Sequence, residues 1–309
     1  MIHPPDTPTA LYPGGDNSIA YLIGVTADEW TMLILRYAMQ GVDRVDQWLE
    51  LLPITPSLLA GRLRRMAGLG IVAPADDRHP LTRRGAGLWP LIVSLAAWED
   101  EWGDDHAEPV PLLWHRPCGA QVKPKMSCGA CGEQVVARDV VGEFGPSGSW
   151  PRSAPSAATR RQAGGSASLG PGFFPHSRAL IGNRWSAAML GSIYLGATRF
   201  SQFHRQVGAP GTVIADRLRT FRDIGVLTAS CEQLSPDRAT FTLTEKGREF
   251  FPVVLSGLQW CREWYVAPEG PAIDFAHRGT DHRFSLRLVC SACEEPLAGR
   301  EIEVTVQPG

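Results

Sequence analysis

The chain has 309 residues, of which 44% are hydrophobic, and its formal net charge is −2. This length and apolar content suit about two domains with buried cores, and the near-neutral balance excludes a protein that attracts nucleic acid through bulk charge. Residues 1–150 hold 12 of the 30 basic and 18 of the 32 acidic residues, so the first half is acidic and the second mildly basic. Any DNA-binding surface must therefore be a local patch.

No apolar run approaches the roughly 20 residues that cross a bilayer. The N-terminal segment MIHPPDTPTALYPGG has neither the basic region nor the apolar core of a signal peptide. We therefore expect a cytoplasmic protein without a membrane partner. Thiols stay reduced there, so the seven cysteines are expected to be metal ligands, redox sensors or core side chains rather than a disulfide framework.

The residue pattern of the first half predicts, in chain order, a helix, a second helix, a recognition helix, a wing and a long helix. Thr55 is a plausible N-cap for the recognition helix, and Pro56 suits its first position. Only the seven letters APADDRH separate Val72 from Pro80, which leaves little room for a wing. The long helix that follows carries an apolar stripe that one small module cannot cover alone, which favours packing against a partner module.

A cysteine cluster follows the long helix in the form H-x2-C-x9-C-x2-C, with His115, Cys118, Cys128 and Cys131. Two close pairs separated by a short loop suit tetrahedral zinc, because each pair can present two donors from a tight turn. Alternation in QVVARDVVGEF predicts a hairpin, and hence a small zinc-ribbon-like appendage. A redox CxxC pair and a metal-free remnant of such a site remain as alternatives.

Residues 145–172 are rich in Gly, Ser, Ala and Pro and contain almost no large apolar side chain. Such a segment cannot bury enough surface to offset its ordering entropy. We therefore expect a flexible linker here.

The second half repeats the first. At an offset of 155 residues, GRLRRMAGLGIV (61–72) lies over DRLRTFRDIGVL (216–227), and Trp30 lies over Trp185. At an offset of 162, matched tryptophans, histidines and cysteines recur: Trp98 with Trp260, Trp102 with Trp264, His115 with His277, Cys128 with Cys290, and Cys131 with Cys293. Such rare residues seldom match by chance, so the chain is a tandem duplication.

The second copy keeps a fuller wing. A helical stripe over 212–224 ends at Gly225, which suits a position just after a helix. Two alternating strands, 226–228 and 239–243, flank the polar tip CEQLSPDR. The next helix starts near Thr244 and runs to Trp264.

The second metal pattern is degraded. His277, Cys290 and Cys293 remain, but Thr280 stands where Cys118 would be repeated. Only a neighbouring residue, His282 or Asp281, offers a substitute ligand, so zinc is doubtful here. Neither pattern has an open position with a general base, and we expect any zinc to be structural. No other residues predict an enzyme active site.

The segments "DRLRTFRDIGVL" and "FTLTEKGREFFPVVLSGLQWCREW", and "EWTMLILRYAMQG" with "LTRRGAGLWPLIVSLAAWEDEW", resemble the HxlR family of winged helix-turn-helix regulators. The resemblance covers roughly 95 residues in each copy. It implies DNA-binding modules that pair through terminal helices, and fusion of two modules implies a pseudo-dimer within one chain.

The resemblance places the DNA contacts on both recognition helices and one wing. The expected residues are Thr55, Ser57, Arg62, Arg64, Arg65, Thr212, Arg217, Arg219 and Arg238. The sequence departs from the family at Ser57 and Thr212, where the family usually has Lys, and at Gly61 and Asp216. A carboxylate facing DNA is unfavourable unless Asp216 pairs with Arg217 or Arg219 or accepts from a cytosine.

Single thiols and the paired tryptophans allow two interpretations each. We expect Cys261 to be a core residue and regard Cys231, in the wing, as a weak sensor candidate. The tryptophans on the long helices are expected to pack between the modules, and an effector pocket lined by them is the alternative.

The sequence thus predicts an α+β protein with two winged helix-turn-helix modules, each followed by a ribbon-like extension. The expected domains are 1–103, 104–144, the linker 145–172, 173–266 and 267–309. We expect a transcriptional regulator that binds double-stranded DNA at an asymmetric operator with two half-sites, and a small-molecule effector is a further partner that this reading allows. The alternative is a non-DNA-binding adaptor or effector-binding protein on the same scaffold.

Overall fold

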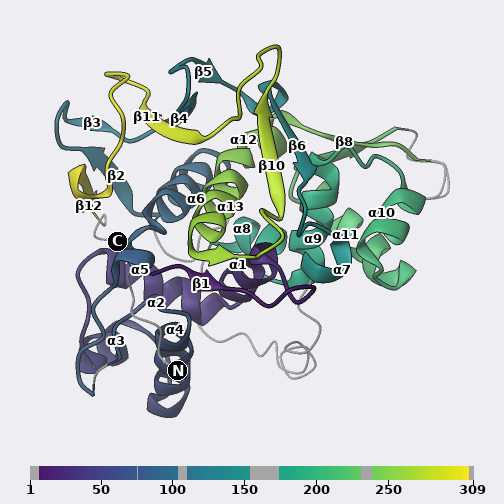
Figure 1. Cartoon of the computed structure of the whole chain (residues 1–309). Helices are drawn as coiled ribbons and strands as arrows, with labels where there is room; N and C mark the ends of the chain where they lie inside the picture. Colours follow the sequence, from purple (N-terminus) through teal and green to yellow (C-terminus); the bar gives the residue numbers. More distant parts are fainter. Residues whose placement is uncertain (1–6, 75, 104–109, 154–173, 231–238, 306–309) are drawn as a thin grey trace.

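The computed structural model describes residues 7–74, 76–103, 110–153, 174–230 and 239–305. Two helical modules carry a layer of strands that crosses their long helices (Figure 1). This arrangement confirms the predicted α+β class. Among the described residues no single helix is long and apolar enough to cross a membrane. The helices α1 (Ser18–Thr26) and α2 (Glu29–Met39) are together long and apolar enough, but the pair is bent by 84°.

The first module owes its helix starts to polar caps. Asn17 and Asp28 accept hydrogen bonds from first-turn amides of the first two helices, and Thr55 and Thr82 cap two later ones. Its described elements are β1 (Thr9–Ala10), α1 (Ser18–Thr26), α2 (Glu29–Met39), α3 (Val45–Leu51), α4 (Pro56–Gly68), α5 (Arg83–Ala86) and α6 (Trp89–Trp102).

The second module repeats this order and adds a two-stranded wing. Gly225 follows α11 with a φ of +75°, a left-handed conformation that favours glycine, as predicted. The tip of the wing, with Cys231 and Arg238, lies outside the described residues. The described elements are α8 (Pro175–Ile181), α9 (Arg184–Tyr194), α10 (Phe200–Val207), α11 (Gly211–Asp223), β7 (Leu227–Ala229), β8 (Phe241–Leu243), α12 (Glu245–Glu249), α13 (Phe251–Trp264) and β9 (Tyr265–Val266).

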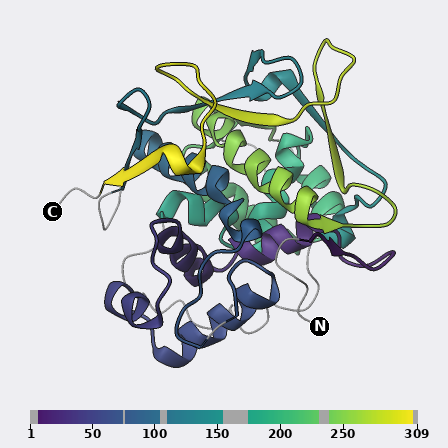
Figure 2. The same ribbon diagram turned by 60° about the vertical axis from the view of Figure 1, so that its left-hand side comes forward.

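The long helices α6 and α13 pack against each other and join the modules (Figure 2). The indole N–H of Trp98 donates to the carbonyl of Lys246 at 3.0 Å, and that of Trp260 donates to the carbonyl of Arg84 at 2.8 Å. These four residues correspond pairwise at the 162-residue offset, so the two bonds are reciprocal. The halves are therefore related by an approximate twofold axis, and Trp98 and Trp260 are buried at its interface as expected.

The two extensions are interleaved. Each of three antiparallel strand pairs takes one strand from either half: β10 with β6, β11 with β4, and β12 with β2. The predicted ribbon-like extensions are therefore present after both modules, and the structure adds that their strands pair across the halves. The described elements are β2 (Leu112–His115), β3 (Ala120–Gln121), β4 (Pro124–Cys128), β5 (Gln134–Val135), η1 (Ala137–Asp139), β6 (Val140–Phe144), β10 (Ile273–His277), β11 (Leu286–Cys290), η2 (Gly299–Glu301) and β12 (Ile302–Thr305).

The segment predicted as a linker begins with packed structure. Residues 145–153 contain a short helix, α7 (Trp150–Ser153), and the ring of Trp150 packs edge-on against Phe144. The side-chain amide of Asn17 donates to the Ser147 carbonyl and to the Ser153 hydroxyl. One aromatic ring and one buried amide thus order a stretch whose composition predicted flexibility, while residues 154–173 lie outside the described residues.

Candidate metal centres and nucleic-acid interface

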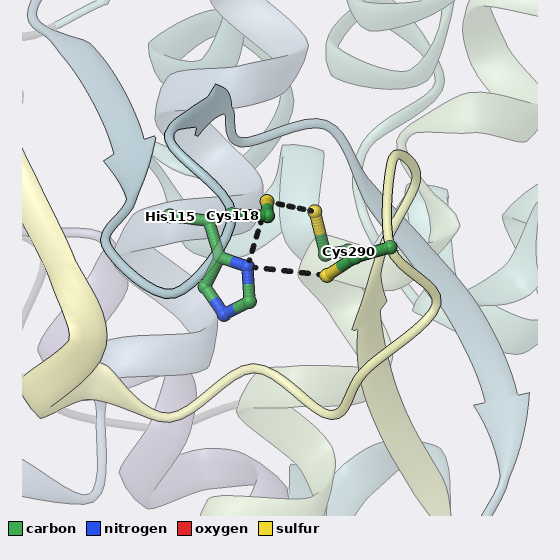
Figure 3. A group of neighbouring side chains, drawn as sticks. His115, Cys118 and Cys290 are labelled. Atoms are coloured by element: carbon green, nitrogen blue, oxygen red, sulfur yellow. Dashed lines mark hydrogen bonds between the residues drawn. The ribbon is translucent and has the colours of Figure 1, made fainter.

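The first cluster joins His115 and Cys118 to Cys290 and Cys293. His115 ends β2 and Cys118 lies in the turn after it, while Cys290 ends β11 and Cys293 follows in its own turn. His115 Nδ1 lies 3.3 Å from Cys118 Sγ and 3.4 Å from Cys293 Sγ. Cys118 Sγ is 3.8 Å from Cys290 Sγ (Figure 3). Two donors thus come from each half of the chain.

The second cluster takes two cysteines, Cys128 and Cys131, from the first half and two histidines, His277 and His282, from the second half. Cys128 Sγ lies 3.3 Å from His282 Nε2, and Cys131 Sγ lies 3.5 Å from His277 Nδ1. Cys128 and His277 are buried.

Both clusters have the dimensions of a tetrahedral zinc site. Bonds of about 2.3 Å to sulfur and about 2.0 Å to nitrogen place neighbouring sulfurs ~3.8 Å apart, and sulfur and nitrogen ~3.5 Å apart. The sulfur–sulfur distance of 3.8 Å and the sulfur–nitrogen distances of 3.3–3.5 Å agree with these edges. In each cluster the four donor atoms lie within 4.8 Å of one another, and four protein donors make a closed, structural type of site.

The surroundings of Cys128 and Cys290 favour the thiolate that a metal requires. The pKa of Cys293 is instead raised, because the lowering by the amide hydrogen bond from Glu295 is outweighed by desolvation and by the sulfurs of Cys118 and Cys290. Burial opposes ionisation of Cys128, but backbone amides of Cys131 and Ala130 and the side chain of His282 lower the pKa of its thiol to about 6. Burial likewise opposes ionisation of Cys290, and the amides of Ala292 and Cys293 lower its pKa. The turns after β4 and β11 thus aim N–H groups at a sulfur in the same way.

The predicted grouping of His115, Cys118, Cys128 and Cys131 into one site is wrong, and strand pairing is the reason. Antiparallel β4 and β11 pair Cys128 with Leu286 and Pro124 with Cys290, so the cysteines lie at opposite ends of the ladder. Each CxxC turn therefore meets a histidine from the other half.

The predicted grouping of His277, Cys290 and Cys293 into a degraded second site is wrong as well, because Cys290 and Cys293 belong to the first cluster and His277 to the second, and each cluster has four donors. His282 supplies the fourth donor of the second cluster, as one of the two substitutes proposed from the sequence. Thr280, at the position of Cys118, instead donates its hydroxyl to the His277 carbonyl.

Cys261 lies inside α13 and is 1% exposed. Burial raises the pKa of its thiol to about 12, which keeps it protonated at neutral pH. This agrees with the expected role as a core residue.

The N-terminal turn of the recognition helix α4 is exposed, whereas two of its arginines contact other residues of the same module. Thr55 and Ser57 are exposed. Arg62 Nε lies 2.8 Å from the buried carboxylate of Asp28, and Arg65 donates to the Gly24 carbonyl at 2.8 Å. Both arginines were expected to face DNA, but here they hold α4 against α1 and α2.

Arg64 remains on the outer side of α4, where it is exposed. Asp28, which fixes Arg62, was missed from the sequence. Its position directly before a helix predicts a cap, but nothing in the pattern shows that one carboxylate also meets an arginine 34 positions later.

The recognition helix α11 carries its own counter-charge. Arg217 lies 2.7 Å and Arg219 3.7 Å from the carboxylate of Asp216. Pairing with these arginines was one of the two alternatives predicted for Asp216. Thr212 is exposed in the first turn. Asn183 stands where the first module has Asp28, and it caps α9 by accepting from the Ser186 amide without a charge to offer Arg217.

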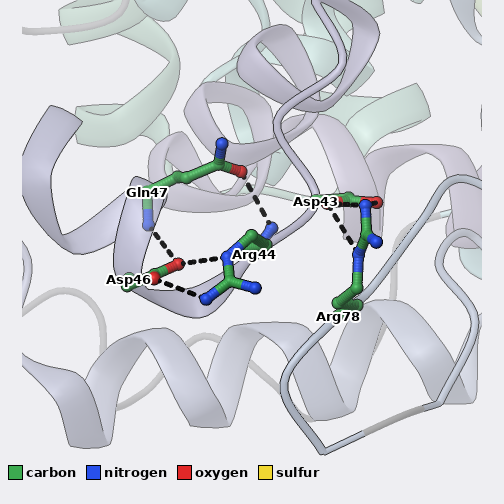
Figure 4. A network of polar contacts seen from close by, with 5 residues as sticks. All are labelled: Asp43, Arg44, Asp46, Gln47 and Arg78. Carbon is green, nitrogen blue, oxygen red and sulfur yellow. Dashed lines mark hydrogen bonds and ion pairs between the residues drawn. The ribbon is translucent and has the colours of Figure 1, made fainter.

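The first module has a short, folded-back connection in place of a protruding wing. The Ala73 amide donates to the Pro80 carbonyl at 2.9 Å, which closes the connection at its base. The Arg78 guanidinium forms a two-pronged contact with Asp43 before α3 (Figure 4). This agrees with the little room that the sequence leaves between Val72 and Pro80.

The chain is similar to several known proteins. The uncharacterised HTH-type transcriptional regulator Rv3095 of Mycobacterium tuberculosis is 33% identical over 130 residues, which are 42% of this chain and 81% of that regulator. The regulator YvaP of Bacillus subtilis is 27% identical over 86 residues, 28% of this chain and 80% of its own. The crystal structure of PA1607, described as a candidate transcription factor, is 25% identical and covers 48% of this chain and 99% of that one, with a TM-score of 0.37.

The model of the HxlR-like helix-turn-helix family matches residues 25–107 and again residues 180–269. These segments contain α2 to α6 and α9 to α13 and together exceed half of the chain. The protein belongs to the HxlR-like helix-turn-helix family and carries the family's module twice.

Proposed function

We propose that this protein is a DNA-binding transcriptional regulator whose two modules act as a built-in dimer. The observation that carries the proposal is the reciprocal pair of bonds from Trp98 and Trp260 across α6 and α13. A twofold relation between two recognition helices suits two half-sites about one helical turn apart. The family and the names of the relatives point to transcription control rather than to an enzyme.

The proposed DNA surface differs between the halves. The first module offers Thr55, Ser57 and Arg64, while Arg62 and Arg65 serve internal contacts. The second offers Thr212, Arg217 and Arg219, with Asp216 reducing the local positive charge. The sequence adds Arg238 as an expected wing contact, which lies outside the described residues. Because the two surfaces differ in shape and charge, the operator should be asymmetric.

We further propose that each Cys/His cluster holds a structural zinc ion. Zinc would supply a strong cross-link between donors that the two halves contribute equally. His115 and Cys118 would bind it with Cys290 and Cys293, and the remaining four donors would hold the second ion. Such links would fix the angle between the modules and therefore the spacing of the half-sites.

A gel-shift titration of the purified full chain against the DNA upstream of its own coding region tests the main proposal. We expect a sequence-dependent complex whose affinity falls steeply between about 50 and 200 mM salt, because phosphate contacts release counterions. The matched control is the same DNA fragment with its bases shuffled. Equal affinity for both fragments, or an affinity independent of salt, would refute sequence-specific regulation.

The alternative is a protein on this scaffold that binds an effector but not DNA. The inward-facing Arg62 and Arg65 and the self-paired α11 favour it, because they leave fewer free cations on the recognition helices. The gel-shift titration separates the two functions.

A further inference from the structure

A cavity with a volume of about 120 Å³, here the junction cavity, lies where the two halves of the chain meet. Its wall takes side chains from α1, α6 and β6 of the first half, from α7, and from α8 to α10, α13 and β10 of the second half. None of its described lining residues is exposed. The cavity is therefore an internal space, and a molecule bound in it would contact both halves.

The wall of the junction cavity is largely apolar, with Ile23, Leu190 and Val253 among its buried residues. Its described lining contains no aspartate, glutamate, lysine, arginine or histidine. A charged molecule would lose its hydration there without gaining an opposite charge, which is unfavourable. The wall therefore selects against ions.

The hydroxyl groups on this wall already donate to backbone carbonyls. The donors are Thr26, Ser153 and Tyr194, and the carbonyl oxygens lie 3.2, 2.8 and 2.7 Å away. Burial raises the pKa of the Tyr194 phenol well above its ordinary value, so the phenol stays neutral. A buried water molecule needs two to four polar partners, and apolar cavities that lack them stay dry. The wall thus offers little to water and favours an apolar occupant.

Aromatic rings make up much of the wall. Phe144 and Trp150 meet edge to face, with ring centres 5.0 Å apart, and Tyr194 lies 4.7 Å from Phe251 between ring centres. Phe275 is a fifth aromatic residue of the lining. Aromatic rings attract further rings in edge-to-face and offset contacts. Apolar cavities of about 150 Å³ take up benzene, and the junction cavity is close to that size.

We propose that the junction cavity binds one small, uncharged aromatic molecule of about the size of benzene. Its ring packs among the aromatic and aliphatic side chains of the wall, and burial of apolar surface supplies the affinity. Because the ligand binds the folded chain, it stabilises that state by mass action. This assignment is independent of DNA binding and of zinc.

Two matched probes test the chemical class on the purified full chain. Fluorobenzene is uncharged, and 4-fluorobenzoate carries the same ring with a carboxylate. Titrations followed by fluorine NMR should show saturable binding of one equivalent of fluorobenzene and no saturable binding of 4-fluorobenzoate. Fluorobenzene should also raise the melting temperature of the protein as its concentration increases.

Substitutions at Gly191 of α9, which lines the junction cavity, test the place of binding. The nearest atoms that a Cβ at this position would meet belong to the Trp150 ring, at 3.9 Å, an ordinary van der Waals distance. Gly191→Ala therefore adds a methyl group beside that ring without a clash. It should weaken fluorobenzene binding about fourfold, the effect of one methylene of apolar contact, and Gly191→Leu should abolish it.

Gly68→Ala is the matched control, because Gly68 ends α4 on the surface and a Cβ there would meet nothing within 4 Å. It should leave the affinity for fluorobenzene unchanged. Both Gly→Ala changes should maintain or raise the melting temperature, since alanine favours a helix more than glycine does. A loss of binding in Gly191→Ala is then separated from a loss of folding.

Three results would overturn the proposal. The first is no saturable binding of fluorobenzene to the unaltered chain, and the second is equal binding of 4-fluorobenzoate. The third is unchanged affinity for fluorobenzene in Gly191→Ala or in Gly191→Leu. If Gly191→Leu does not fold, Gly191→Ala decides the third result.

Discussion

The carboxylate of Asp28 lies 2.8 Å from Arg62 Nε and also accepts from the Thr31 amide that begins α2. The carboxylate of Asp28 thus caps α2 and also anchors the recognition helix α4, which packs on α2. In the second module the same position is Asn183, which caps α9 but leaves Arg217 to pair with Asp216. One charge therefore decides the partner of this arginine, because the two side chains are similarly exposed, 21% for Arg62 and 29% for Arg217.

Asp28→Asn should keep the cap of α2 and remove the charge that Arg62 faces. Because Asp28 is 4% exposed, we expect the free energy of unfolding to fall by roughly 1–3 kcal/mol. Urea denaturation followed by fluorescence measures it. Asp46→Asn, which breaks the exposed contact with Arg44 (Figure 4), is the control and should leave stability unchanged. Equal losses for the two variants would mean that Asp28 has no special role.

Pairs of cysteine substitutions distinguish crossed from local metal sites. Cys118→Ser with Cys290→Ser removes two donors of one cluster, so the protein should retain one equivalent of zinc. Cys118→Ser with Cys128→Ser damages both clusters, so zinc should fall towards zero. Metal analysis of the untagged protein gives the stoichiometry, with two equivalents expected for the unaltered chain. The reverse order of the two double variants would indicate sites within each half.

Zinc affinity should weaken as the pH falls through about 6. The pKa of Cys128 is lowered to about 6, so its sulfur is a thiolate above that pH and binds a proton below it. Proton and metal then compete, and affinity at the second cluster should fall at least about tenfold per pH unit below pH 6. Competition with a chromophoric chelator between pH 7.5 and 5 measures this. Constant affinity over that range would contradict a thiolate ligand at Cys128.

Substitutions on α4 should separate DNA contact from internal support. Arg64→Ala should weaken DNA binding and reduce the slope of log affinity against log salt by about one, as for loss of one phosphate contact. Arg62→Ala should instead lower the free energy of unfolding, because it leaves the buried Asp28 carboxylate with only the longer contact to Arg65 at 3.7 Å. Gel shifts across a salt series and urea denaturation, applied to both variants, measure the two effects. Arg138→Ala, on the extension, is the control for general charge loss. An unchanged slope for Arg64→Ala would exclude a phosphate contact at that residue.

The duplication and the helices were predictable because they depend on local patterns. The apolar stripe of 212–224, the turn at Gly225 and the polar caps are each decided within a few residues. The wing of the second module follows from alternation in the same way, and the buried interface of Trp98 and Trp260 follows from a stripe too long for one module.

The metal grouping was not predictable, because the two halves carry equivalent patterns. Spacing shows that His115 and Cys118 form one pair and Cys128 and Cys131 another, but it is silent on which copy completes each. Only the register of β4 against β11 decides this, and that register depends on contacts between residues more than 150 positions apart. The inward turn of Arg62 escaped prediction for the same reason, since it depends on a distant carboxylate.

The exchange of strands between the halves has a consequence for what holds the chain together. Three strand pairs and both Cys/His clusters cross from one half to the other, so the covalent connection is redundant once folding is complete. A protease that cuts the backbone once within residues 154–173 should give two fragments that stay bound to each other. In the absence of denaturant they should therefore migrate as a single species. Such an assembly is an exchanged dimer whose two partners happen to share a polypeptide.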